Sequence, residues 1–254
     1  MDFIQRVFGE QKRIVVGVIL AAVTLLIGYI DNFFLMWLVL GIAYYFAFSE
    51  AMKLFAKENN TVYVLGALVW LAAAFYPQPD DLIFPVLIFL AAVAAYRGEV
   101  DEKLFLPFLY PTASFLFILA LYNDFGVMSL LWMLVVVAGS DIGAYFTGRA
   151  IGKTKFSPTS PNKTIEGVFG GLVAGVIFGV LVGLYYVDVW AALAISALVS
   201  IASIFGDLFE SYLKRQAGVK DSGTLFPGHG GMLDRVDGYL FGGVILLILL
   251  RGIA

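Results

Sequence analysis

The chain has 254 residues, of which 61% are hydrophobic and only 14% are charged, with a formal net charge of −3. Soluble domains carry about 25% charged residues, so this chain has too few to cover a water-facing surface, which predicts an integral membrane protein. It has no cysteine and a single histidine, His229. Disulfides, thiol catalysis and cysteine- or histidine-rich metal sites are therefore excluded.

Nine apolar stretches predict about nine transmembrane helices. They are continuous runs without charged residues, unlike the alternating segments of an outer-membrane barrel, and helices satisfy their own backbone hydrogen bonds in lipid. Single acidic residues, Asp31, Asp124 and Asp188, separate several neighbours and predict tight hairpins. The last run reaches a spanning length only if its helix begins upstream of Asp237 and Asp234. The runs cover residues 14–30, 32–49, 59–79, 82–96, 104–123, 125–140, 167–187, 189–206 and 238–250.

The distribution of lysine and arginine predicts the orientation of these helices. With the N-terminus inside, every basic residue except Arg251 falls on the inner side, and the outer turns carry only acidic residues. We therefore expect one all-α, polytopic membrane domain over residues 1–254, with the N-terminus cytoplasmic and the C-terminus outside. Residues 1–140 have short connections and are expected to form a scaffold. The remainder, 141–254, is expected to be the catalytic half.

The N-terminal segment leaves alternatives open. The first apolar run follows basic residues, as in a signal peptide, but it lacks a clear small-residue cleavage site and further spans follow it. We therefore expect it to be retained. Apolar residues recur at helical spacing within residues 2–13, which is typical of an interfacial helix on the inner leaflet, although a frayed tail is equally consistent.

The first of two polar segments on the inner side covers residues 141–166. Asp141 and Tyr145 are four residues apart and share one helix face. Two Ser-Pro turns flanked by cations follow, and Thr164 is a candidate N-cap for the next helix. Charge alone fits a loop that only sets topology. The glycines, the Ser-Pro turns and Asp141 favour a functional segment, because topology requires none of them.

The second polar segment, residues 207–237, gives a stronger functional signal. Asp234 and Asp237 lie three residues apart at the start of the last helix. Ionisable groups within spans are costly and usually mark a polar cavity or a transport path. Carboxylates at two helix ends would form an oxygen-ligand site for Mg²⁺, which also takes substrate phosphates. The other helix end carries one stripe at i, i+3, i+4 and i+7, formed by Asp207, Glu210, Ser211 and Lys214.

Between these helix ends lies the sequence Pro227-Gly228-His229-Gly230-Gly231, which predicts a tight turn whose backbone N–H groups can approach an anion. We interpret His229 as a substrate contact in preference to a turn residue, and not as a general base, because a phosphomonoester is already largely ionised near neutrality. The pattern favours metal-assisted phosphate chemistry over a solute transporter, which requires neither the glycines nor clustered cations. These cations are Lys214, Arg215, Lys220 and Arg235.

The second segment resembles the signature of the phosphatidate cytidylyltransferase (CDP-diacylglycerol synthase) family. The first segment is similar to that family's Asp-x-Gly-Ala-Tyr…Gly-Arg…Gly-Lys…Ser-Pro-x-x-Ser-Pro-x-Lys-Thr-x-Glu-Gly stretch, without a departure at a polar signature position. Residues 1–140 agree only in architecture. The matching pattern is Ser211-x-Leu213-Lys214-Arg215-x4-Lys220-Asp221-x-Gly223-x2-Phe226-Pro227-x-His229-Gly230-Gly231-Met232-x-Asp234-Arg235-Val236-Asp237.

The resemblance implies transfer of CMP from CTP to phosphatidic acid, giving CDP-diacylglycerol and pyrophosphate in phospholipid biosynthesis. It implies Mg²⁺ as cofactor and leaves open a second cation, monovalent or divalent. It also suggests a homodimer, and no nucleic acid is expected as a partner. The expected location is a bacterial-type inner membrane, with the active site facing the cytoplasm.

The resemblance also implies roles for individual residues. Asp207, Asp234 and Asp221 would be metal ligands. The residues expected to act in catalysis are Asp207, Asp234, Lys214, Arg215, Lys220 and Arg235. Those expected to bind substrate are Ser211, Asp221, His229, Gly230, Gly231, Asp237, Asp141, Tyr145, Arg149 and Lys163.

Other functions remain as alternatives. A CTP-dependent polyprenol kinase would use similar chemistry on another lipid, but the complete signature argues against it. A CDP-alcohol phosphotransferase is disfavoured because its Asp-Gly-x2-Ala-Arg motif is absent. A transporter for an anionic solute is the alternative from a different class.

Overall fold

A computed structural model describes residues 17, 19, 22–56, 59–98, 102–226 and 230–253. Within these residues the regular structure is helical, apart from two isolated bridges, Lys155 with Thr164 and Phe226 with Gly230. The helices are apolar and long, as the sequence predicts. The chain is an all-α membrane protein.

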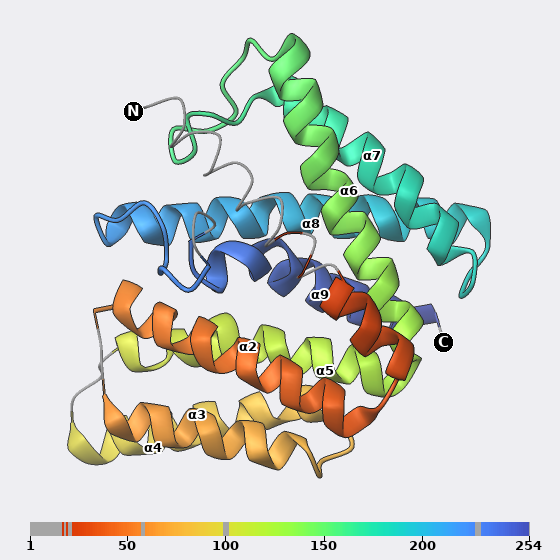
Figure 1. The fold of residues 1–254 in the computed structure, drawn as a ribbon. Coiled ribbons are helices and arrows are strands. Elements are labelled where there is room, and N and C mark those ends of the chain that lie inside the picture. The colour runs from red at the N-terminus through yellow and green to blue at the C-terminus, as the bar shows by residue number, and fades with distance from the viewer. Residues whose placement is uncertain are drawn as a thin grey trace.

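The helices follow one another through mostly short connections (Figure 1). Three short helical turns, labelled η, interrupt the series in its first half. In chain order the elements are α2 (Phe33–Leu54), α3 (Asn60–Ala73), η1 (Pro79–Leu82), α4 (Ile83–Arg97), η2 (Glu102–Leu104), η3 (Phe108–Thr112), α5 (Ala113–Phe125), α6 (Val127–Ile151), α7 (Ile165–Gly183), α8 (Val189–Gln216) and α9 (Leu233–Ile253).

Seven helical segments among the described residues are long and apolar enough to cross a membrane. Helix α3 is apolar but has only 14 residues. Of the first predicted span, residues 17, 19 and 22–30 are described, and they are helical. The count of nine spans and the orientation of the termini therefore stay predictions. The expected interfacial helix over residues 2–13 lies outside the described residues.

The boundaries of two helices bear on the predicted hairpins and on the short last run. Helix α9 begins at Leu233 and so includes both Asp234 and Asp237, which confirms the upstream extension. The chain reverses after α5 at Gly126 and not at Asp124, which stays in the last turn of α5. Gly126 has a φ of 72°, a left-handed conformation that glycine adopts without steric cost.

Helix α9 lies at the centre of the molecule (Figure 1). Helices α2, α3, α4 and α5 lie on one side of it and α8 on the other, with the pair α6 and α7 packed against α8. Leu240, Leu246 and Leu247 of α9 are completely buried. Because α9 contacts both groups of helices, its N-terminal end can collect polar side chains from either side.

Helices α6 and α7 approach closely because one face of α7 is lined by glycine. A Cβ at Gly171 would collide with the backbone carbonyl of Ser140 on α6. In lipid, such close backbone packing is a main source of helix association, because burial of apolar surface adds little. The glycines of this buried face are Gly167, Gly171, Gly175, Gly179 and Gly183.

At the C-terminal end of α9, Arg251 holds three elements together. Its guanidinium lies 2.5 Å from Asp80 of η1 and 2.7 Å from Asp124 of α5. The lone basic residue that we assigned to the outer side therefore meets two of the acidic residues assigned to that side. We call this group the outer clasp.

Candidate active site

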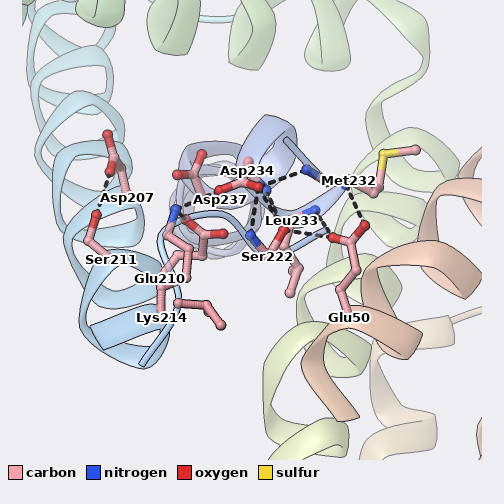
Figure 2. A network of polar contacts seen from close by, with 12 residues as sticks. Glu50, Asp207, Glu210, Ser211, Lys214, Ser222, Met232, Leu233, Asp234 and Asp237 are labelled. Carbon is pink, nitrogen blue, oxygen red and sulfur yellow. Dashed lines mark hydrogen bonds and ion pairs between the residues drawn. The ribbon is translucent and has the colours of Figure 1, made fainter. Parts of the chain in front are cut away.

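The candidate site lies where the C-terminal half of α8 meets the N-terminus of α9 (Figure 2). Helix α8 carries the complete predicted stripe from Asp207 to Lys214, and α9 carries Asp234 and Asp237. The structure therefore brings together the two carboxylate-bearing helix ends that the sequence places at opposite ends of the second polar segment. We call this group of residues the inner site.

Lys214 is the cation that joins α8 to α9. Its Nζ lies 2.5 Å from Oε2 of Glu210, one turn earlier on α8, and 2.6 Å from Oδ1 of Asp234. The Lys214 side chain is 10% exposed and that of Asp234 is 6% exposed. Because water screens these charges poorly, removing the ammonium group would leave two buried carboxylates without the cation that neutralises them.

The second oxygen of Asp234 binds the loop that precedes α9. Its Oδ2 accepts hydrogen bonds from the backbone N–H of Ser222 and of Gly231, both at 2.8 Å, and from the Ser222 hydroxyl at 2.9 Å. Gly230 has a φ of 82°, a conformation that favours glycine and forms the turn that presents the next N–H to Asp234. Asp234 is thus held on both oxygens.

Asp207 connects α8 to the first polar segment. Its Oδ2 lies 2.5 Å from Nζ of Lys163, and its Oδ1 accepts a hydrogen bond of 3.3 Å from the Ser211 hydroxyl. Lys163 is in the loop between α6 and α7, where its carbonyl accepts from the N–H of Phe156 at 2.9 Å. Thr164 caps α7 by accepting from the N–H of Gly167 at 3.1 Å, which confirms the predicted N-cap.

Glu166 closes the base of this loop. Its carboxylate accepts from the backbone N–H of Lys153 at 3.1 Å, and from the N–H and hydroxyl of Thr154 at 3.2 and 2.9 Å. The loop is therefore fixed at both ends, and Lys163 projects from a defined turn towards α8. The two polar segments meet through the ion pair of Lys163 with Asp207.

Carboxylates outnumber cations in the inner site. Glu210 is fully buried, and its Oε1 has no hydrogen-bond partner among the described residues. An excess of carboxylate oxygens of this kind favours a divalent cation. Five acidic groups act on one another here, Asp141, Asp207, Glu210, Asp234 and Asp237, and the cations beside them are Lys163, Lys214 and Arg235.

No three acidic or histidine side chains among the described residues converge into a ready metal site. Asp221 is exposed on the loop after α8. The predicted trio of Asp207, Asp234 and Asp221 is therefore not assembled in the described part of the chain, and the metal role of each stays a prediction. Mg²⁺ commonly takes one or two carboxylates together with substrate phosphates and waters, so a single carboxylate such as Asp207 or Asp234 fits its chemistry.

Several predicted site residues lie apart from the network around Lys214. Arg215 donates to the carbonyl of Val219 at 2.9 Å, and Lys220 is exposed. Tyr145 and Arg149 hydrogen-bond to each other at 2.7 Å on an exposed face of α6. The side chains of these cations are exposed on the surface of the molecule.

The remaining predicted site residues in question are Asp141, Arg235 and His229, and the structure describes the first two. Asp141 is exposed on α6, within range of the charges of Asp207 and Lys163. Arg235 is exposed at the start of α9, and its positive charge is within range of Asp141. His229 lies outside the described residues, so its role stays a prediction.

Two residues that sequence reasoning missed complete the network, Glu50 and Ser222 (Figure 2). The Ser222 hydroxyl lies 2.8 Å from Oε2 of Glu50, and the carboxylate also accepts from the N–H of Met232 at 2.9 Å and of Leu233 at 2.8 Å. Glu50 comes from α2, within the part expected to be scaffold. The available signal was a carboxylate at the end of an apolar run, since ionisable groups near a span can mark function.

Known proteins with similar sequences share one kind of activity. A model of the cytidylyltransferase family matches residues 11–253. The chain is 44% identical over 249 residues to a phosphatidate cytidylyltransferase of Helicobacter pylori, which covers 97% of this chain and 94% of that protein. A phosphatidate cytidylyltransferase of Brucella suis is 36% identical over 259 residues, with 92% and 93% covered. One of Thermotoga maritima is 46% identical over 142 residues, about half of each chain.

Proposed function

Because this chain belongs to the cytidylyltransferase family, we propose that it transfers CMP from CTP to phosphatidic acid, giving CDP-diacylglycerol and pyrophosphate. The observation that carries the proposal is the similarity, over almost the whole chain, to proteins named for this reaction. The inner site supports it, because its charged groups lie at the ends of apolar helices, where a lipid headgroup and a soluble nucleotide can meet.

The reaction is an in-line displacement between two anions. The phosphate of phosphatidic acid attacks the α-phosphorus of CTP, and pyrophosphate leaves on the opposite side. The attacking phosphate is already ionised near neutrality and needs no general base. Lys163 and Lys214, which pair with Asp207 and Asp234 before substrate binds, offset the repulsion between the two substrates when they contact phosphate oxygens.

Mg²⁺ dependence belongs to the proposal. Asp207 and Asp234 are the residues that would hold the ion, supported by the excess of carboxylates and by the unpaired oxygen of Glu210. The bound ion would neutralise charge on the triphosphate and on the leaving pyrophosphate. A second cation, monovalent or divalent, is part of the same proposal.

The surrounding residues would orient the substrates. Arg215, Lys220 and Arg235 are exposed cations suited to the triphosphate. Tyr145 and Arg149, paired on α6, would line the opposite wall. The proposed substrate contacts are completed by Ser211, Asp221, Asp237, His229, Gly230 and Gly231.

The proposed location is a bacterial-type inner membrane, with the inner site facing the cytoplasm. The distribution of lysine and arginine supports this orientation, since the site lies at the end of the helices that carries almost all of them. CTP is a cytoplasmic nucleotide, which requires the same orientation. A homodimer is proposed on the family resemblance alone.

The test is a pyrophosphate-release assay on the purified protein in detergent, with CTP, Mg²⁺ and phosphatidic acid. Wild-type protein should release pyrophosphate only when the lipid is present. Absence of lipid-dependent pyrophosphate would contradict the proposal. Formation of CDP together with a phosphorylated prenol would instead favour the polyprenol kinase.

A further inference from the structure

Glu50 is a buried carboxylate whose hydrogen bonds all reach the segment that carries Asp234. The residue is 7% exposed and lies near the C-terminal end of α2. Its Oε1 accepts from the N–H of Met232, and its Oε2 accepts from the N–H of Leu233 and lies within hydrogen-bond distance of the Ser222 hydroxyl. Within the described residues Glu50 forms no ion pair, so hydrogen-bond donors alone compensate its charge.

These contacts make Glu50 a cap of α9 supplied by another helix. The first N–H groups of a helix have no partner within the helix, and they form the positive end of its dipole. A carboxylate at Met232 and Leu233 satisfies two of them and fixes the direction in which α9 begins. Asp234 is the next residue, so the direction of this first turn determines where its carboxylate points (Figure 2).

A second connection runs through Ser222. Its hydroxyl lies 2.8 Å from Oε2 of Glu50 and 2.9 Å from Oδ2 of Asp234, so one side chain stands between the two carboxylates. A hydroxyl has a single proton and can donate to only one of them at a time. The hydroxyl therefore couples the position of Asp234 to that of Glu50.

The loop is shaped around the Glu50 carboxylate. A Cβ at Gly223 or at Gly231 would collide with it, so both glycines leave room for this side chain. An apolar side chain would fill the same space without the cost of burying a charge. Packing alone therefore does not account for a carboxylate at this position, whereas its hold on the loop and on α9 does.

We propose that Glu50 is a positioning residue of the active site: it holds the loop and the first turn of α9 so that Asp234 is presented in the geometry that the reaction needs. This inference rests on the proposed function. Glu50 acts through Ser222 and the backbone of Met232 and Leu233, and touches no reacting atom.

The kinetic test compares Glu50→Gln with Tyr44→Phe. Glu50→Gln keeps the volume but removes the charge and one acceptor. Tyr44 lies on the same helix, is 4% exposed, and bonds through its hydroxyl to Thr112 at 3.0 Å, so Tyr44→Phe also removes a buried hydrogen bond from α2. We expect kcat to fall at least about tenfold in Glu50→Gln, the usual scale for residues that orient catalytic groups, and to stay at the wild-type value in Tyr44→Phe.

A spectroscopic test separates positioning from general stability. The chain has no cysteine, and Thr224 is exposed on the loop, so Thr224→Cys provides a single site for a nitroxide spin label. We expect the label to become more mobile when Glu50→Gln is added and to remain unchanged when Tyr44→Phe is added. This measurement needs no substrate. If Glu50→Gln cannot be purified, Glu50→Asp, which withdraws the carboxylate by one methylene, serves both tests.

Two results would overturn the inference. The first is wild-type turnover in the Glu50 variant. The second is unchanged mobility of the spin label, together with a loss of turnover no larger than the loss of thermal stability explains. Failure of the proposed function looks different. In that case the wild-type protein releases no lipid-dependent pyrophosphate, while the spin label still reports whether Glu50 holds the loop.

Discussion

The two ends of α9 both carry an ion pair to a buried carboxylate, Asp80 at one end and Asp234 at the other, but they use different cations. In the outer clasp, Arg251 binds both oxygens of Asp80, at 2.5 and 3.1 Å, and Asp124 at 2.7 Å. A guanidinium fork fits a carboxylate in one geometry and suits a permanent connection. In the inner site the ammonium groups of Lys163 and Lys214 contact the carboxylates. An ammonium is a point charge on a flexible stem and exchanges partners readily.

The surroundings of the two ends differ in the same direction. The outer clasp connects η1, α5 and α9 directly. The inner site has more carboxylates than cations, a buried oxygen of Glu210 without a partner among the described residues, and a glycine-containing loop beside it. We infer that the outer end serves stability, whereas the inner end is built so that phosphate and metal can replace its internal ion pairs.

The largest expected effect is on turnover, when one carboxylate is neutralised at each end of α9 and the two variants are compared. Asp234→Asn should lower turnover at least about a hundredfold, because it removes a charge from the proposed metal site at a point where charge develops in the transition state. Lipid-dependent pyrophosphate release measures the effect. Asp124→Asn, the matched change in the outer clasp, should keep wild-type turnover. Equal losses in both variants would contradict the division between the ends.

The second prediction concerns the choice of lysine in the inner site. Lys163→Arg keeps the positive charge beside Asp207 but offers a bidentate fork, which should hold the carboxylate more rigidly. We expect turnover to fall about tenfold. In the proposed reaction Lys163 exchanges Asp207 for a substrate phosphate, and electrostatic contacts of this kind contribute at least about tenfold to the rate. Thermal stability should stay close to that of the wild type. Unchanged turnover would show that exchange at Asp207 does not limit the reaction.

The third prediction concerns the outer clasp alone. Arg251→Met should lower the free energy of unfolding by about 2 kcal/mol, because it removes charge-assisted hydrogen bonds to the buried Asp80. Denaturation in detergent measures this loss. Turnover per folded molecule should be unchanged at a temperature where the variant is folded. A loss of turnover without a loss of stability would contradict a purely structural clasp.

The smallest expected effects on stability come from removing two helix caps, one near each end of α9. Thr164→Ala removes the cap of α7 next to Lys163, and Asp188→Ala removes the cap of α8, where Asp188 accepts from Trp190 and Ala191. Each should cost about 1 kcal/mol of stability. Only Thr164→Ala should also lower turnover, because the same turn positions Lys163. Paired melting curves and assays compare them.

The local features of the fold were predictable from sequence because they depend on near neighbours. The stripe from Asp207 to Lys214 follows from helical spacing, and the Thr164 cap follows from its position before an apolar run. The extension of α9 across Asp234 follows from the length that a span requires. The charge pattern predicts a reversal at Asp124, but the chain reverses two residues later, at Gly126, because backbone conformation decides the turn.

The partners of the charged groups were not predictable in the same way. Lys214 pairs with Glu210 as helical spacing allows, but helix packing selects its second partner, Asp234, and also selects Asp207 as the partner of Lys163. Asp221 has a signature position like that of its neighbours but lies exposed on the loop. Composition and spacing identify which groups take part, and not which pairs form between different elements.

The sequence by itself determined that this is a helical membrane protein, which polar segments matter, and the family whose signature they carry. These properties depend on hydropathy, on periodicity and on residue type at fixed spacing, all of which a linear chain displays. Only the tertiary structure decided that Glu50 belongs with the loop and with α9. That contact joins residues 172 to 183 positions apart, and it arises because the C-terminal end of α2 meets the start of α9 in three dimensions.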